Sequence, residues 1–317
     1  MTLNQLEYAL AVSQYGSFKL AAEKLYLTQP ALSMQIQKLE QELGIRIFDR
    51  TQSPVTITDD GAKFLERARE IVTATRQLYD FSVNLNQDFD GQVKLGIIPT
   101  LAPYLVPWFV EPLLKAFPQF RLDIHELITE KVIQGVLSGE LDAGIISTPV
   151  SVSGLNVMPL FYEKFYIYTS EKSMYGHDAI DLRNIEYSNL WLLEEGNCFR
   201  DQINNFCDLN KIRKNKQLVY RSHSIDALIR LVDAKGGITI LPELSTLSLS
   251  QEQEENIREI SGKPKAREIS IIKSRFRGKE RFIAKITEYI RTNIPKTMLS
   301  SEGLEIVDPE IQVSLRP

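Results

Sequence analysis

The alternation of apolar and polar positions predicts three short helices at the N-terminus. Apolar residues recur at helical spacing over 4–15, and Gly16 ends this first helix. Ser17 can cap a second helix, FKLAAEKL, and Thr28 can cap a third, QPALSMQIQKLEQEL. One face of the third helix is an apolar stripe, formed by Ala31, Leu32, Ile36, Leu39 and Leu43. A helix, a tight turn and a helix with an exposed polar face together predict a helix-turn-helix.

The polar face of the third helix carries side chains that suit base edges and phosphates. The candidate DNA-binding residues there are Thr28, Gln29, Pro30, Ser33, Gln35 and Lys38. Two short strands, IRIFDR and VTITDDG, are predicted to follow as a wing, where Arg46, Arg50 and Thr51 can contact phosphates. Periodicity alone favours a plainer interpretation, a small helical subdomain whose polar face only meets water.

A long amphipathic stretch, DGAKFLERAREIVTATRQLYDFSVNLNQ, predicts a linker helix over 59–88. Every seventh position is large and apolar (Phe64, Ile71, Leu78 and Leu85), with Ala68 between them. This spacing predicts a coiled-coil seam of about three heptads that joins two chains. The alternative is a helix docked on its own domain, although a winged module over 1–58 offers little surface for docking.

From Gln92 onward, strands alternate with helices, which predicts an α/β effector domain over 92–295 with a parallel sheet. The pattern divides it into one lobe over about 92–162 plus 268–295 and a second over about 163–267. Ligand sites in such folds lie in the cleft between the lobes. The tail, 296–317, has no clear periodicity, and we expect it to be poorly ordered.

Composition adds limits to this α+β multidomain picture. The chain has 317 residues, 43% of them hydrophobic and 25% charged, which is typical of a soluble protein of more than one domain. It contains no apolar run long enough for a membrane span and no secretory signal at its start, so we expect a cytoplasmic protein. The formal net charge of −4 argues weakly against non-specific nucleic-acid binding.

The only two cysteines of the chain lie in one segment, LLEEGNCFRDQINNFCDLN. Asn197 can cap a helix there, which places Cys198 in the first turn, where the helix dipole favours a thiolate; Glu194 and Glu195 oppose this effect. If the segment is helical, nine steps separate the Cα atoms of Cys198 and Cys207 by about 13 Å. A disulfide tolerates no more than roughly 7 Å. Bridging would therefore require the helix to unwind.

Two plainer explanations of the cysteines stay open. Buried thiols often act as small apolar side chains and are usually inert, and Cys207 on an apolar helix face fits that role. Metal binding explains the pair less well, because the spacing is not a zinc pattern and the segment contains no His. We therefore predict no metal site.

The stretch SFKLAAEKLYLTQPALSMQIQKLEQELGIRIFDR, followed by VTITDDGAKFLERAREIV, resembles the N-terminal module of LysR-type transcriptional regulators. The family pattern runs Ala-Ala, Leu, Thr/Ser-Gln-Pro/Ser-Ala-Leu-Ser, Ile, Leu-Glu, Leu-Gly and Leu-Phe-Arg, and this chain matches nearly all of it. The resemblance implies promoter binding at palindromic half-sites of double-stranded DNA, self-association as a dimer or tetramer, and action with RNA polymerase. It also implies an effector domain of the periplasmic-binding-protein type.

Further segments, IPTLAPYLVPWFVEPLLKAFP, LLEEGNCFRDQ and GGITILP, resemble the OxyR-like, hydrogen-peroxide-sensing branch of that family. This resemblance implies that Cys198 is the peroxidatic thiol and that Cys207 resolves it into a disulfide. It also implies a peroxide pocket formed by Thr100, Thr129, Asp201 and Arg267. On this interpretation the protein needs no cofactor and reacts stoichiometrically with peroxide, so it is not an enzyme.

Two other functions fit the same sequence. A LysR-type regulator can respond to a small metabolite in the cleft between the lobes while its cysteines stay passive. A solute-binding or amino-acid-converting protein can also be built on a two-lobed fold. Salt-dependent binding of palindromic DNA by residues 1–88 would exclude the latter.

Overall fold

The computed structural model describes residues 1–50, 54–84, 91–170, 179–185, 189–194, 197–207, 220–274, 279–309 and 311. It divides into two compact units, one built mainly from 1–88 and the other from 89–274 and 279–313. Each unit has a hydrophobic core of its own. These units correspond to a helix-turn-helix region with its linker helix and to an α/β effector domain, so the predicted fold class is confirmed.

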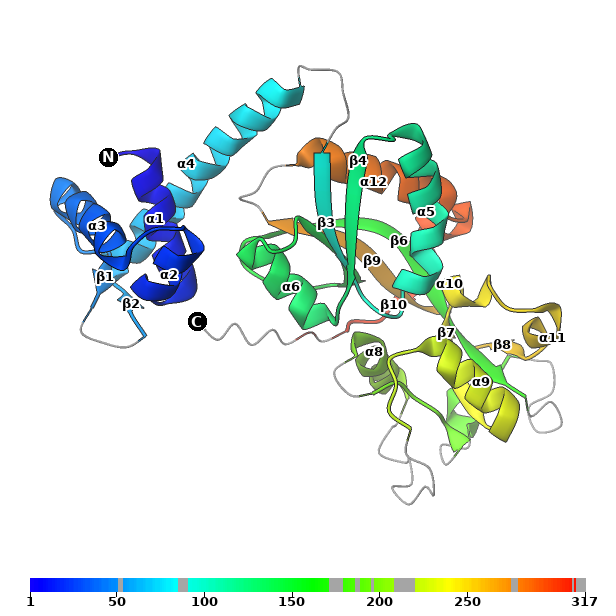
Figure 1. Cartoon of the computed structure of the whole chain (residues 1–317). Coiled ribbons are helices and arrows are strands. Elements are labelled where there is room, and N and C mark those ends of the chain that lie inside the picture. Colours follow the sequence, from blue (N-terminus) through cyan, green and yellow to red (C-terminus); the bar gives the residue numbers. More distant parts are fainter. Residues whose placement is uncertain are drawn as a thin grey trace. The chain divides into compact units, whose positions relative to one another are not determined.

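The N-terminal unit begins with α1 (Leu3–Tyr15), α2 (Phe18–Lys24) and α3 (Gln29–Leu43) (Figure 1). As predicted, α1 ends at Gly16, and the hydroxyls of Ser17 and Thr28 accept hydrogen bonds from the first turns of α2 and α3. Three side chains of α3, Leu32, Ile36 and Leu39, are fully buried. The apolar stripe thus fixes which face of α3 remains outside.

A short antiparallel hairpin of β1 (Phe48–Asp49) and β2 (Thr56–Ile57) follows α3, which confirms the two predicted wing strands. The Glu40 carboxylate ties this hairpin to α3. One oxygen accepts the backbone N–H groups of Ile47 and Phe48 at 2.7 and 3.1 Å, and the other accepts Arg50 Nη2 at 2.9 Å. Thr51 lies outside the described residues.

The linker helix α4 (Asp59–Asn84) packs its first half against α1. Ala68 is 1% exposed and lies against Leu6 and Val72, so the prediction that it contacts a second chain is wrong. Phe64 is also half-buried against its own unit. By contrast, Ile71 and Leu78 are 47% and 67% exposed, so both remain available for another chain. Leu85 lies outside the described residues.

The first lobe of the effector unit contains parallel strands β3 (Gly91–Ile97), β4 (Phe120–Glu126) and β5 (Ala143–Thr148). Helix α5 (Ala102–Ala116) packs beside α12 (Glu280–Asn293), and α6 (Thr129–Ser138) packs on β3 and β5. Among the described residues the sheet has eight strands, with the central order β4-β3-β5-β9-β6-β7.

Two long strands, β6 (Leu155–Thr169) and β9 (Lys265–Ser274), join the lobes (Figure 1). β6 pairs with β9 over 155–164 and then with β7 (Ile238–Pro242) and β8 (Ile257–Glu259) over 165–169. Because the chain returns through β9 antiparallel to β5 and β6, the sheet is mixed and not parallel throughout as predicted.

Within the described residues, the second lobe contains η1 (Leu182–Asn184), α8 (Cys198–Phe206), α9 (Ile225–Lys235), α10 (Glu243–Thr246) and α11 (Gln251–Glu254). Helices α9 and α10 pack on β6 and β7. The core contains Phe199 and Ile203 of α8 together with Phe165 of β6, whose ring stacks on Phe199 at 5.4 Å between centroids. Helix α8 is therefore fastened to the strand that crosses between the lobes.

The C-terminal tail is ordered over 296–309, contrary to our expectation for 296–317. It forms η4 (Lys296–Leu299) and β10 (Glu305–Ile306), and β10 pairs in parallel with Lys265–Ala266 of β9. Met298 and Val307 are buried at 1% and 7% exposure. Local periodicity gave no sign of this order because it depends on pairing with residues 40 positions earlier.

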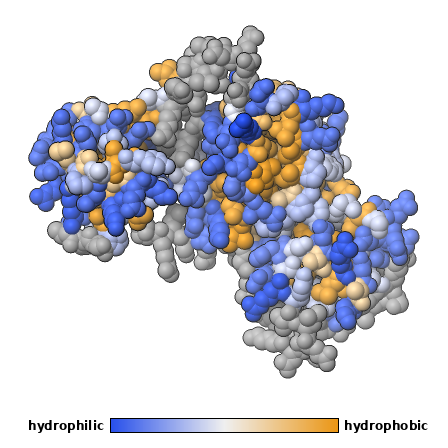
Figure 2. Space-filling view, in the orientation of Figure 1, coloured by the Kyte–Doolittle hydropathy of each residue, from blue (hydrophilic) through white to orange (hydrophobic). Residues whose placement is uncertain are grey.

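Figure 2 shows hydrophobic residues gathered on one face over β4 and α5. These elements carry partly buried Val106, Val110, Leu122 and Ile124 and the 36% exposed Leu114.

Within the described residues, no helix combines the length and the apolar character that crossing a membrane requires.

Candidate functional site

Helix α8 carries one cysteine at each end. Cys198 is its first residue, and Asn197 caps it by accepting the N–H of Phe199 on Oδ1 at 3.0 Å. Cys207 is the C-cap residue, and its N–H donates to the carbonyl of Ile203 at 2.8 Å. Both side chains are buried thiols, at 5% and 2% exposure. The intervening residues are helical as predicted, so the two Cα atoms stand about 13 Å apart.

The sulfur of Cys198 faces the N-terminus of a second helix, since Thr129 is the first residue of α6. Burial raises the pKa of Cys198 above its ordinary value, while the Thr129 hydroxyl and the positive charge of Arg267 act in the opposite direction. The thiolate-favouring effect of the helix end is thus outweighed by loss of solvent, and the sequence-based hypothesis of a lowered pKa is wrong.

Thr129 Oγ1 is itself a notable atom. The atom is buried, and no hydrogen bond of ordinary geometry reaches it from the described part of the chain. It nevertheless lies close enough to the Cys198 sulfur to favour the thiolate form of that residue. A buried hydroxyl without a full partner is costly unless a further polar group can reach it. This atom therefore marks a polar position beside the Cys198 sulfur.

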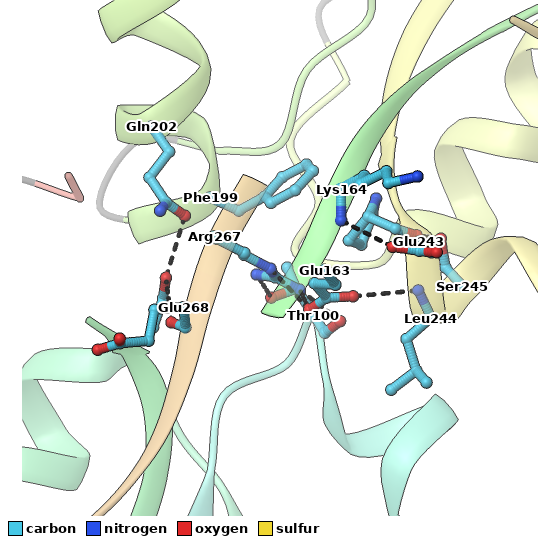
Figure 3. Close-up of polar contacts among 12 residues, drawn as sticks. Thr100, Glu163, Lys164, Phe199, Gln202, Glu243, Leu244, Ser245, Arg267 and Glu268 are labelled. Atoms are coloured by element: carbon cyan, nitrogen blue, oxygen red, sulfur yellow. Dashed lines mark hydrogen bonds and ion pairs between the residues drawn. The ribbon is translucent and has the colours of Figure 1, made fainter. Parts of the chain in front are cut away.

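Arg267, whose charge acts on the Cys198 thiol, belongs to a buried ion pair (Figure 3). Arg267 of β9 and Glu163 of β6 are both 0% exposed, and Arg267 Nε donates to Glu163 Oε1 at 2.8 Å. Arg267 Nη1 also donates to Thr100 Oγ1 at 2.9 Å, and the guanidinium lies 4.9 Å from the centre of the Phe199 ring. Glu163 Oε2 accepts the N–H of Leu244 at 3.1 Å.

The structure brings together four of the residues predicted for the site: Cys198, Thr129, Arg267 and Thr100. It does not bring Asp201 into this buried group, because the Asp201 side chain is exposed, although its charge raises the pKa of Cys198. Their roles toward peroxide remain predictions. Within the described residues, no group of His, Cys, Asp and Glu side chains is arranged to hold a metal ion.

Two residues of the site were missed from the sequence. Glu163 gave no local signal, because a charged residue at the start of a predicted strand is normally exposed and its partner is 104 positions away. Gln202 of α8 is also 0% exposed, and its side chain accepts Ser147 Oγ at 3.2 Å. Its place on the inner face of an amphipathic helix, between Phe199 and Phe206, was the available signal.

The predicted DNA-facing residues fall into three groups. Thr28, Gln29, Pro30, Lys38, Arg46 and Arg50 are exposed. Ser33 is half-buried and accepts Arg50 Nη1 at 3.1 Å, so these two side chains hold each other in place. Gln35 is half-buried and accepts Gln5 Nε2 at 3.3 Å, which turns it toward α1 instead of outward as predicted.

Two family models match the chain, and together they span both units. The model described as a bacterial regulatory helix-turn-helix protein of the lysR family matches residues 3–62, and the LysR substrate binding domain matches residues 86–293. The chain belongs to the LysR family. The resemblance inferred from the sequence is thereby confirmed.

Several LysR-family relatives are similar over most of their length. The "Hydrogen peroxide-inducible genes activator" of Haemophilus influenzae is 31% identical over 78% of this chain and 82% of that protein. The "HTH-type transcriptional regulator EstR" of Acinetobacter baylyi is 30% identical over 77% of this chain and 80% of that protein. Among solved structures, a full-length OxyR variant from Pseudomonas aeruginosa has a TM-score of 0.66 and 28% identity, covering 93% of this chain and 99% of that one.

Proposed function

We propose that this protein is a peroxide-responsive, DNA-binding transcriptional regulator that is switched by a reversible disulfide between Cys198 and Cys207. The observation that carries the proposal is the position of Cys198, in the first turn of α8 beside the under-bonded Thr129 hydroxyl and the Arg267 guanidinium. The relatives named as peroxide-inducible gene activators and as OxyR support the same assignment.

The chemistry needs a thiolate, a polar site for peroxide and a second thiol. The Cys198 thiolate attacks one peroxide oxygen, the O–O bond breaks, and hydroxide leaves as sulfenic acid forms on the sulfur. Thr129 and Thr100 supply hydroxyls and Arg267 supplies positive charge near that sulfur, which favours the thiolate and the leaving hydroxide. Cys207, as its thiolate, then attacks Cys198 Sγ; the S–S bond forms as the S–O bond breaks, and hydroxide leaves.

The reaction is stoichiometric, so the protein acts as a sensor and not as an enzyme. Its output requires two DNA-reading units, because one recognition helix reads only a half-site. The exposed Ile71 and Leu78 of α4 support self-association as a dimer or tetramer, and a promoter-bound activator of this kind would act with RNA polymerase in the cytoplasm.

Mass spectrometry of the peptide spanning Leu192 to Asn210 tests the proposal. Mild peroxide should lower the mass of this peptide by two hydrogens, since one disulfide forms within it, and reduction should restore the original mass. An untreated sample with its thiols blocked serves as the control. A peptide that gains only oxygen atoms, or does not react, would contradict the disulfide switch.

DNA reading is tested separately with α3. Gln29→Ala should weaken specific binding by about 1–3 kcal/mol if its amide contacts a base edge, whereas Lys38→Ala should weaken binding to all sequences and lower the salt dependence. Gln41→Ala, an exposed glutamine on the same helix, is the matched control. Equal affinities of the Gln29→Ala and Gln41→Ala proteins for the same operator would exclude Gln29 as a base contact.

A second function has specific support. Burial raises the pKa of Cys198, which slows any thiolate reaction, and the similarity to EstR is nearly as high as that to the peroxide regulators. Both observations fit a LysR-family regulator that binds a small metabolite between the lobes while its thiols remain passive. A serine substitution at position 198 separates the two candidates, as argued below.

A further inference from the structure

The C-terminal segment 304–309 is built onto the effector sheet beside α8. The N–H groups of Glu305 and Val307 donate to the carbonyls of Pro264 and Ala266 at 2.9 and 2.8 Å, so the segment continues the edge of β9. Lys265 Nζ also pairs with Glu305 Oε1 at 2.6 Å. A stretch with these main-chain bonds is held as an added strand and not as a loose end.

Two side chains of α8 bind this segment directly. Gln202 Nε2 donates to the carbonyl of Val307 at 2.7 Å, and Asn205 Nδ2 donates to the carbonyl of Asp308 at 2.7 Å. The other end of the Gln202 amide accepts Ser147 Oγ of β5 at 3.2 Å, a bond that links α8 to the first lobe. The Gln202 amide therefore connects three elements that are distant in the sequence.

These bonds require α8 to be helical. Gln202 and Asn205 are three residues apart, so they lie on one face of a helix and reach adjacent carbonyls of the segment together. Unwinding α8 far enough to close the gap from about 13 Å to the roughly 7 Å that a disulfide allows would separate the two amides from those carbonyls. The docked segment therefore opposes the unwinding of α8 that a disulfide needs.

We propose that residues 304–309 form a clasp that, with Gln202 and Asn205 as positioning residues, holds α8 in its reduced form and sets the rate of the resolving step. This proposal rests on the disulfide switch proposed above and adds the element that restrains it. The clasp acts after Cys198 has become a sulfenic acid, when Cys207 must travel to Cys198 Sγ and displace hydroxide. Once the disulfide has formed, the segment is released from α8.

The clasp should affect the rates of the two chemical steps differently. Its bonds fall on the fifth and eighth residues of α8, beyond the first turn that holds Cys198. Loss of the clasp should leave the rate of sulfenic acid formation unchanged and accelerate disulfide formation. For the loss of one hydrogen bond of ordinary strength the acceleration is about three- to tenfold.

Asn205→Ala removes one bond of the clasp from an exposed position, and Asn204→Ala is its matched control on the same helix. Both changes raise helix propensity equally, so their ratio isolates the contact with the segment. Sulfenic acid is followed with a selective trap such as dimedone, and the disulfide by mass, at peroxide concentrations where the first step does not limit. A chain ended after Ser301, which keeps η4, provides the full loss.

We expect Asn205→Ala and the shortened chain to form the disulfide faster than Asn204→Ala with an unchanged first step. Equal disulfide rates, or equal acceleration of both steps, would overturn the clasp. Amide exchange gives an independent measurement, because shortening should speed exchange over 202–207 in the reduced protein.

The two proposals fail in different ways. If peroxide produces no disulfide in the wild-type chain, the proposed function fails, and the exchange of α8 amides in the reduced proteins still decides the clasp. Unchanged exchange over 202–207 after shortening would overturn it.

Discussion

Replacing Cys198 by serine should abolish the transcriptional response to peroxide, leaving the output at the level of the unstressed protein. A serine hydroxyl is not oxidised by peroxide, so neither the sulfenic acid nor the disulfide can form. The fold should survive, because serine is similar in size and its hydroxyl can meet the under-bonded Thr129 hydroxyl. The measurement is reporter transcription with and without peroxide, together with the mass of the Leu192 to Asn210 peptide.

The matching variant, Cys207→Ser, should give a different chemical product. Cys198 should still react and then remain as a sulfenic or more oxidised acid, so the peptide gains oxygen instead of losing two hydrogens. DNA binding by both reduced variants serves as the control for folding. A Cys198→Ser protein that still responds fully to peroxide would exclude the sensor and favour the regulator that responds to a metabolite.

Breaking the buried ion pair should have the largest effect on stability. Glu163→Gln leaves the Arg267 guanidinium buried without its counter-charge, and removing one partner of such a pair costs about 3–5 kcal/mol. Urea unfolding of the effector unit can be followed by tryptophan fluorescence, because both tryptophans, Trp108 and Trp191, lie in that unit. The transition should move to lower urea concentrations.

Two comparisons make this prediction specific. Glu288→Gln removes one partner of the exposed Lys285–Glu288 pair and should cost less than about 1 kcal/mol. The double change of Glu163 to Leu and Arg267 to Met should recover much of the loss, because an apolar pair of similar volume replaces both charges. If Glu163→Gln proves no more costly than Glu288→Gln, the buried pair does not contribute the stability that its burial predicts.

The parts of the fold that follow from short-range rules were predictable. Ser17 and Thr28 could be assigned as caps, and Gly16 as a helix end, because a cap needs only its own residue and the next turn. The helical segment between the two cysteines was predictable for the same reason. Its amphipathic pattern and Asn197 suffice to place Cys198 at the first turn of α8.

Contacts between residues that are distant in the sequence could not be predicted from short-range rules. Glu163 and Arg267 form their pair across 104 positions, and the tail is ordered by β9. The prediction that the pKa of Cys198 is lowered was wrong for a related reason. The helix dipole can be inferred from the local sequence, whereas the degree of burial depends on residues distant in the sequence, such as Thr129 of α6 and Arg267 of β9, that lie near the sulfur.

The continuous course of β6 and β9 through both lobes limits how this protein can move. Large domain closures usually turn on a few loop residues that change their backbone angles freely. In this protein the two lobes are connected by paired strands. A hinge opening of the lobes would have to break backbone hydrogen bonds between residues 155–164 of β6 and β9. A local change costs less free energy: the short helix α8 can unfold and refold while the paired strands of the effector unit stay in place.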